Sequence, residues 1–243
     1  MRGSNPIFSS DSYQRSSYGN TNTMSIRGTI NKTLLLLLLL VATSAYTYNI
    51  TATKGLSYGF LIGVAIVCFI LVMVTMFKPA VAPFTAPIYA LLEGVAVGNA
   101  SAIFEGFYSG IVLQAVCVTL GVTFAALLLY TSRTIRVTSK FRKIVMIATL
   151  GVFITYLVQL VFMLFGVSIP FLHQSTPLNI GISIVILIIA SLNLLLDFDQ
   201  IESGTRNQLP KVYEWVSSVG LLVTLVWIYF EALRLVALLR NRD

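Results

Sequence analysis

The stretch LNIGISIVILIIASLNLLLDF, residues 178–198, contains a single charged residue, Asp197, and that residue lies next to its end. A helix of about 20 apolar residues spans the roughly 30 Å hydrocarbon core of a bilayer. In hydrocarbon, every backbone amide and carbonyl must be bonded within the protein, and a helix achieves this within one segment. Residues 178–198 are therefore predicted to form a membrane-spanning helix.

The composition of the whole chain agrees with this prediction. Of the 243 residues, 57% are hydrophobic and 10% are charged, and the mean hydropathy is +0.88, whereas an ordinary soluble domain has about 25% charged residues. The chain contains six further apolar runs that are too long and continuous for barrel strands. We predict an all-α membrane protein, a seven-transmembrane helix bundle, with spans at residues 33–50, 56–77, 84–104, 107–131, 141–167, 178–198 and 213–239.

The segment before the first run has a different composition. Residues 1–24 are rich in Ser, Asn and Tyr and are predicted to form a disordered polar tail, because they cannot bury enough apolar surface to fold. Residues 25–243 would then form one transmembrane domain. The first run resembles the core of a signal peptide, but a basic region of roughly thirty residues precedes it, so we expect it to be retained as a helix.

The distribution of basic residues predicts the orientation, because Lys and Arg concentrate in cytoplasmic loops. With a cytoplasmic N-terminus, twelve of the sixteen Lys and Arg residues lie inside, and the C-terminus lies outside unless the last helix is re-entrant. The twelve are Arg2, Arg15, Arg27, Lys32, Lys78, Arg133, Arg136, Lys140, Arg142, Lys143, Arg206 and Lys211. The net charge of +7 then indicates membrane lipid, anionic lipid above all, as a partner. No motif indicates nucleic acid.

Two residue types have simple structural interpretations. Gly59 and Gly63, and likewise Gly94 and Gly98, are spaced four apart, a pattern typical of helices that pack closely. Cys68 and Cys117 lie inside predicted spans without CxxC spacing, so we expect buried apolar thiols and neither a disulfide nor a metal site.

Some of the acidic residues also have ordinary interpretations. Glu202 and Glu214 flank the loop at residues 203–211, and we expect both to face water there. Glu231 stands three residues before Arg234, where helical geometry favours an ion pair.

Asp197 and Asp199 differ, because ionisable residues inside a membrane are costly and usually functional. Two residues along a helix correspond to a rotation of roughly 200°. We therefore expect one of these acids to face the bundle and the other to face the headgroups or the loop. Asp197 is the deeper one, and Asn193 lies one turn further in on the same predicted face. We interpret Asp197 as a proton-sensing acid and Asp199 as its local companion.

Glu93 is the candidate partner of Asp197. In the third predicted span it lies at a depth similar to that of Asp197, beside the Gly94 and Gly98 surface that admits a close neighbour. Two acids that share a proton would titrate as a coupled pair and could gate a passage or bind Ca²⁺ transiently. The alternative is that each acid bonds separately to a helix hydroxyl or to water. We expect no fixed metal site.

Four segments carry a family resemblance. They are SNPIF (residues 4–8), APIYALLEGVAVGNASAIFE (residues 86–105), LLLDFDQIESG (residues 194–204) and YEWVSSVGLLVTLVWIYFEALRLVALL (residues 213–239). Together they resemble the bacterial branch of the Bax inhibitor family, the transmembrane Bax inhibitor motif proteins. The resemblance implies seven helices with the last one central, in the bacterial inner membrane. It also implies a pH-sensitive calcium leak controlled by two buried aspartates, one from the end of the sixth helix and one from the seventh.

The first of these aspartates corresponds by position to Asp197. The seventh helix, SSVGLLVTLVW over residues 217–227, has no carboxylate there, so Glu93 and Asp199 become the substitute candidates for the partner. Glu231 lies roughly 27 Å along the axis from Tyr213, near the opposite face of the membrane from Asp197.

Three classes of function remain open. The first is a pH-sensitive cation leak, with Ca²⁺ as the expected ion. The second is a non-transporting regulator of a stress response or a quality-control protease, acting through helix contacts with a membrane protein partner. The third, an intramembrane enzyme, is disfavoured, because the chain has no GxGD motif and one histidine, His173. A coupled transporter ranks below the leak, because the chain shows no clear repeat. We expect no cofactor and no catalysis.

Overall fold

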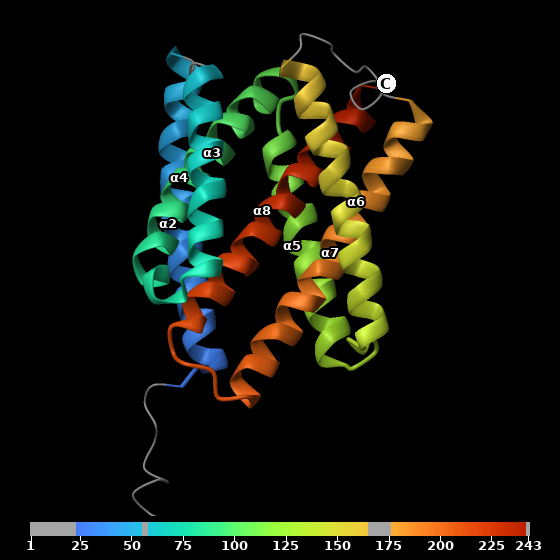
Figure 1. The fold of residues 1–243 in the computed structure, drawn as a ribbon. Helices are drawn as coiled ribbons and strands as arrows, with labels where there is room; N and C mark the ends of the chain where they lie inside the picture. Colours follow the sequence, from blue (N-terminus) through green and yellow to red (C-terminus); the bar gives the residue numbers. More distant parts are fainter. Residues whose placement is uncertain (1–22, 55–57, 165–175, 242–243) are drawn as a thin grey trace, which may run out of the picture.

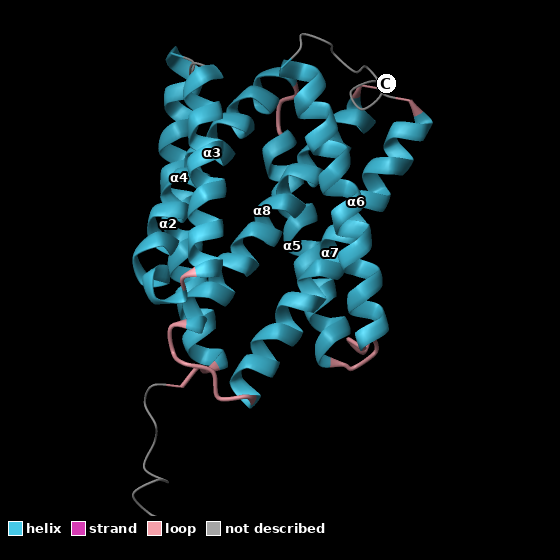
Figure 2. Ribbon diagram, in the orientation of Figure 1, coloured by secondary structure: helices cyan, strands magenta, loops and turns pink. Residues whose placement is uncertain are grey.

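The computed structural model describes residues 23–54, 58–164 and 176–241, and these residues form a bundle of long helices (Figures 1 and 2). The long helices are α2 (Ile26–Lys54), α3 (Tyr58–Phe77), α4 (Ala82–Phe107), α5 (Ile111–Thr131), α6 (Ser139–Leu164), α7 (Pro177–Arg206) and α8 (Tyr213–Arg240). A short 3-10 helix, η2 (Pro79–Val81), precedes α4. Most of the predicted tail, and His173, lie outside the described residues.

Among the described residues, seven helices are long and apolar enough to cross a membrane, so the prediction of an all-α bundle with seven spans is confirmed. Large apolar side chains are exposed along the outward surfaces of the bundle, as a lipid environment requires. Successive helices run in opposite directions (Figure 1). We call the end where α2 begins the N-terminal end of the bundle, and the end where α8 finishes the C-terminal end.

The helices extend beyond several of the predicted spans. α2 begins at Ile26, not at residue 33, and α7 continues to Arg206. The prediction that the sixth helix ends near residue 198 is therefore wrong, because α7 ends at Arg206. The length of an apolar run measures only the part of a helix in hydrocarbon, while backbone hydrogen bonds continue into the polar zone. Asp197 consequently lies more than two turns before the end of α7.

α8 crosses the middle of the bundle (Figure 1) and packs against α2, α4, α5 and α7. Half of the residues in its most apolar window are buried, a larger share than in any other span. One hydrophobic core joins α8 to α2, α3, α4 and α5, and a second joins it to α5 and α7. The expectation of a central last helix thus has a physical basis in two cores that share α8.

α2 and α4 pack closely against each other. A side chain at Gly94 would overlap Thr43 and the carbonyl of Leu40, and a side chain at Gly98 would overlap the backbone of Ser44. The predicted close packing at these two glycines is therefore present. Gly63 differs, because nothing lies within 4 Å of the place a side chain would take.

A single methyl group tests this contact. We expect Gly98→Ala to lower the free energy of unfolding by about 1–3 kcal/mol, because the methyl group meets the backbone of α2 and forces the helices apart. Gly121→Ala is the matched control, since the corresponding space on α5 is open. Thermal unfolding of the purified variants measures both. Equal melting temperatures for the two variants would contradict the close contact.

Candidate functional site

Asp197 lies on the buried face of α7. The buried residues of this face recur every three or four positions: Ser183, Ile186, Ala190, Leu194, Ile201 and Gly204. Such spacing places side chains on one face of a helix. Asp197 follows Leu194 by three residues and precedes Ile201 by four, so it interrupts an otherwise apolar or small stretch of that face.

The neighbour of Asp197 is Thr224 of α8, whose hydroxyl lies within hydrogen-bonding reach. Thr224 also donates to the carbonyl of Gly220, 3.2 Å away in its own helix, and one hydroxyl proton cannot serve both acceptors. Asp197 Oδ2 is buried and has no hydrogen-bond partner among the described residues. The α7–α8 contact therefore holds an incompletely satisfied carboxyl group, which is costly to bury.

Glu93 has a different environment. Its carboxyl group is partly buried on α4 and lies within hydrogen-bonding reach of the Cys68 thiol of α3. The helices that pack against α7 are α2, α5, α6 and α8. Glu93 and Asp197 therefore each have a neighbour of their own, as in the alternative considered from the sequence, although the neighbour of Glu93 is a thiol and not a hydroxyl group.

Asp199 and Asn193 both bond to α6. Asp199 Oδ2 accepts a hydrogen bond from Arg142 Nη2 at 2.6 Å. Asn193 Nδ2 donates to Thr149 Oγ1 at 2.7 Å. Asn193 thus bonds to a different helix from Asp197, although the two are one turn apart, and Asp199 is paired with a basic residue at the N-terminal end of α6.

Glu202 joins the end of α7 to the α5–α6 connection. Its Oε1 accepts hydrogen bonds from Arg206 at 2.7 Å and from Arg133 at 3.0 Å, and its Oε2 accepts one from the Tyr130 hydroxyl. Arg206 lies four residues after Glu202 in the same helix, so this pair is local. The contacts to Arg133 and Tyr130 come from distant parts of the chain, which the sequence could not bring together.

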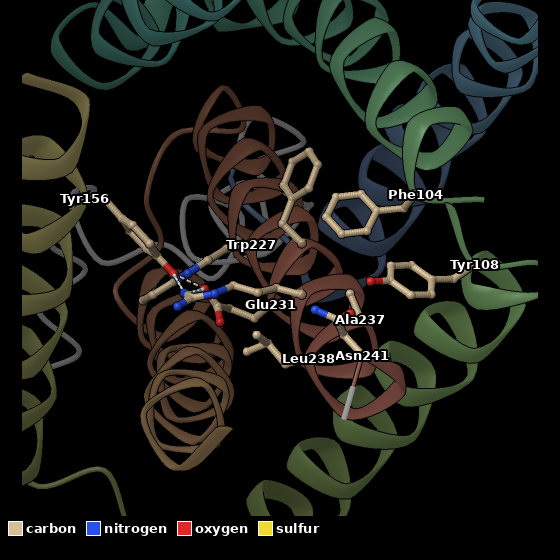
Figure 3. A pocket seen from close by; sticks show the side chains of 10 residues that line it. Phe104, Tyr108, Tyr156, Trp227, Glu231, Ala237, Leu238 and Asn241 are labelled. Carbon is tan, nitrogen blue, oxygen red and sulfur yellow. Dashed lines mark hydrogen bonds and ion pairs between the residues drawn. The ribbon is translucent and has the colours of Figure 1, made fainter. Parts of the chain in front are cut away.

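Glu231 forms a buried cluster near the C-terminal end (Figure 3). It is 3% exposed and accepts hydrogen bonds from the Tyr156 hydroxyl of α6 and from Ser183 Oγ of α7, the latter at 3.3 Å. Arg234 Nη1 lies 3.6 Å from Glu231 Oε1 and 3.0 Å from the Tyr156 hydroxyl oxygen. The expected Glu231–Arg234 pair is thus part of a cluster that joins three helices.

A cavity of about 510 Å³ opens beside this cluster. Glu231, Arg234 and Tyr156 contribute to its wall, and the rest is largely aromatic (Figure 3): Phe104, Tyr108, Trp227 and Phe230. The C-terminal half of α8 therefore carries a charged pair that is buried on one side and borders open space on the other.

Glu214 lies at the start of α8 and is 1% exposed. It pairs with Lys32 of α2 and accepts hydrogen bonds from the backbone and the hydroxyl of Ser25. The expectation that Glu214 faces water is therefore wrong. The chain before α2 folds over the start of α8, where Met24 N donates to the carbonyl of Leu209 at 2.7 Å, and this segment covers the carboxylate.

Within the described ranges, no group of three or more His, Cys, Asp or Glu side chains is arranged to hold a metal ion. A family model described as "Bax inhibitor 1 like" matches residues 5–241. The chain belongs to the Bax inhibitor 1-like family. Neither a curated protein nor a solved structure gives a significant match. The family resemblance noted from the sequence is thus confirmed, and the protein is an integral membrane protein of this family.

In this Bax inhibitor family member, the sixth and seventh spans are α7 and α8. The resemblance implies a second aspartate on the seventh helix, which this sequence lacks, and the α8 residue beside Asp197 is Thr224, not one of the substitute candidates Glu93 and Asp199. Sequence reasoning missed this threonine, as it missed Tyr156, Ser183 and Lys32. The sequence contained one indication of a role for Thr224: it lies seven residues before Glu231, and this spacing places both side chains on the same face of a helix.

The buried ion pair at Glu214 can be compared with an exposed one. We expect Glu214→Gln to lower the free energy of unfolding by about 3–5 kcal/mol, because the substitution leaves Lys32 without its counter-charge in a largely buried place. Asp199→Asn makes the same chemical change at a more exposed pair and should cost less than about 1 kcal/mol.

Denaturant titration of the two variants, followed by helix content, measures the difference. A larger loss for Asp199→Asn than for Glu214→Gln would contradict the assignment of Glu214 as the stabilising pair.

Proposed function

We propose that the protein is a pH-sensitive cation leak, with Ca²⁺ as the expected ion, and that Asp197 is the acid whose protonation closes the path. The observation that carries this proposal is the buried Oδ2 of Asp197, which has no hydrogen-bond partner among the described residues. An ionised carboxylate in such a place lacks compensation for lost hydration. Either a proton or a passing cation would compensate the charge of the carboxylate, so the two would compete for the same oxygen.

The arrangement of α8 supports the proposal. Thr224 and Glu231 lie on one face of α8, about 10.5 Å apart along the axis, and both meet α7, through Asp197 and Ser183 respectively. A cation entering from the aromatic cavity at the C-terminal end would meet the Glu231–Arg234 pair first and Asp197 second. Glu231 is neutralised by Arg234 and would not attract the cation, whereas Asp197, which has no ion pair among the described residues, would attract it.

The chemistry of the site also suits this ion. Ca²⁺ is bound by carboxylate, carbonyl and hydroxyl oxygens in flexible geometry. One carboxylate with one hydroxyl would hold it weakly, which favours passage over storage. Glu93 is a second candidate for an acid that senses pH or lines the ion pathway. We further propose that the protein is not an enzyme and that it lies in the bacterial inner membrane with a cytoplasmic N-terminus, as the basic loops indicate.

The first test measures Ca²⁺ flux into proteoliposomes from about pH 5 to pH 8, above the ordinary carboxyl range of about pH 4 and within the range to which burial can move carboxyl titration. For the unmodified chain, we expect flux to rise with pH, because deprotonation opens the path. Asp197→Asn imitates the protonated acid and should give low flux that changes less than about two-fold over this range.

The control is Asp199→Asn, two residues away on α7 and already paired with Arg142, which should keep the pH dependence. Glu93→Gln in the same assay reports whether that acid lies on the path. A pH-dependent flux that survives Asp197→Asn would overturn the role of Asp197, and no flux from any folded variant would overturn the leak.

A second prediction concerns Thr224. Thr224→Asp would place a second carboxyl group opposite Asp197, and two interacting acids lose their protons in two steps. The flux profile should therefore spread over a wider pH range than that of the unmodified chain. Thr224→Asn is the control, because it is similar in size to aspartate but does not titrate. An unchanged profile for Thr224→Asp would show that the two positions do not act together.

A non-transporting regulator is the second candidate. The observation that favours it is the attachment of the N-terminal segment, where Thr23 forms a β-bridge with Pro210 and Ser25 bonds to Glu214. A partner that pulled on this segment would act directly on α8. Under this alternative, deletion of residues 1–22 would abolish the cellular effect and Asp197→Asn would preserve it.

A further inference from the structure

The connection between α5 and α6, together with the first residues of α6, carries a group of exposed basic residues at the N-terminal end of the bundle. Two of its five cations are engaged by acids of α7: Arg133 by Glu202 and Arg142 by Asp199. The other three, Arg136, Lys140 and Lys143, are exposed and make no ion pair with any residue that the structure describes. Three positive charges therefore face the polar zone of the membrane without a counter-charge from the protein.

The start of α6 adds to this positive field. Thr138 accepts a hydrogen bond from Phe141 N at 3.2 Å, and its carbonyl accepts one from Arg142 N at 2.9 Å, so the helix begins at this point. The first turn of a helix presents partly positive amide groups that favour anions. Lys140 lies in that turn and Lys143 at its end, and Arg136 precedes it.

An exposed apolar stripe continues from these cations along α6. Lys143, Ile147, Leu150 and Ile154 are spaced by four, three and four residues, which places them in one row on the helix. The three apolar members are 71%, 57% and 52% exposed, respectively. α6 also has the smallest buried share of the seven spans, so this row is open to lipid over most of its length.

We propose that this surface, Arg136, Lys140 and Lys143 with the row Ile147, Leu150 and Ile154, is a binding site for one anionic phospholipid of the surrounding membrane. The phosphate group would lie between the three cations at the start of α6, and an acyl chain would lie along the row below. Charge complementarity selects an anionic headgroup, and the length of the apolar row selects a membrane lipid over a soluble phosphate. The site does not depend on the proposed leak.

The test counts the lipids retained by the purified full-length protein in native mass spectrometry, with dioleoyl-phosphatidylglycerol or dioleoyl-phosphatidylcholine titrated in. We expect the unmodified chain to retain phosphatidylglycerol in preference to phosphatidylcholine. Each cation near an anionic surface strengthens association about five-fold. The triple variant Arg136→Gln/Lys140→Gln/Lys143→Gln should therefore bind phosphatidylglycerol on the order of 100-fold more weakly.

The matched control removes the same charge from the same end of the bundle. Arg27, Lys78 and Lys211 are exposed cations on the N-terminal part of α2, before α4 and before α8. The start of α2 and the connection before α4 lie apart from the connection between α5 and α6 (Figure 1). Triple substitution of these three cations by Gln should change retention by less than about three-fold, because it alters only the general potential. Excess glycerol phosphate, the soluble headgroup, should not displace the lipid.

Three outcomes would overturn the site. They are equal loss of phosphatidylglycerol in the two triple variants, unchanged retention in the α5–α6 variant, and displacement of the lipid by glycerol phosphate. Helix content and thermal unfolding confirm that the variants fold. If the first triple variant does not fold, Lys140→Gln/Lys143→Gln gives the same test with an expected loss of about 25-fold, and unchanged retention in that variant overturns the site in the same way.

Discussion

A buried polar side chain on a helix with neighbours on every side needs a partner on one of those neighbours or in its own helix, and the contacts to neighbouring helices organise the bundle around α8. Its polar residues reach four surrounding helices. Glu214 pairs with Lys32 of α2, Ser218 donates to the carbonyl of Thr29 of α2, Thr224 meets Asp197 of α7, Tyr229 bonds to Ser101 of α4, and Glu231 bonds to Tyr156 of α6 and Ser183 of α7. Each of these contacts fixes the rotation of α8 about its axis, because a buried polar group without its partner is costly.

These contacts are unequal, and the inequality locates the functional candidate. At the N-terminal end, Glu214 has a cation and two donors from Ser25. At the C-terminal end, Glu231 has a cation and two hydroxyl groups. Asp197, between them, has one shared hydroxyl group and an oxygen without a partner among the described residues. Protonation of Glu214 or Glu231 would remove an ion pair at one end of α8, whereas protonation of Asp197 would remove a charge that has no cation beside it among the described residues.

The sequence predicted the number of spans well, because the cost of exposing backbone to hydrocarbon leaves a direct mark on composition. It predicted the helix ends poorly, since α2 and α7 continue past the apolar runs on their own hydrogen bonds. The burial of Glu214 was not predictable from its neighbours in sequence, because its cover comes from Ser25 and Lys32 at the other end of the chain. Thr224 was missed for a related reason: its seven-residue spacing from Glu231 places both on one face of α8, but only the α7–α8 contact shows that this face meets Asp197.

The absence of a cation beside Asp197 follows from the geometry of α7. The basic residues of the α5–α6 connection reach Asp199 and Glu202, whereas Asp197 points to α8, roughly 200° around the helix from Asp199. Among the described residues, no basic side chain forms an ion pair with Asp197. A basic side chain able to serve both aspartates would have to pass around the helix. The same segment of α7 therefore combines two acids that are ion-paired near the membrane surface, Asp199 and Glu202, with one acid inside, Asp197, that has no ion pair among the described residues.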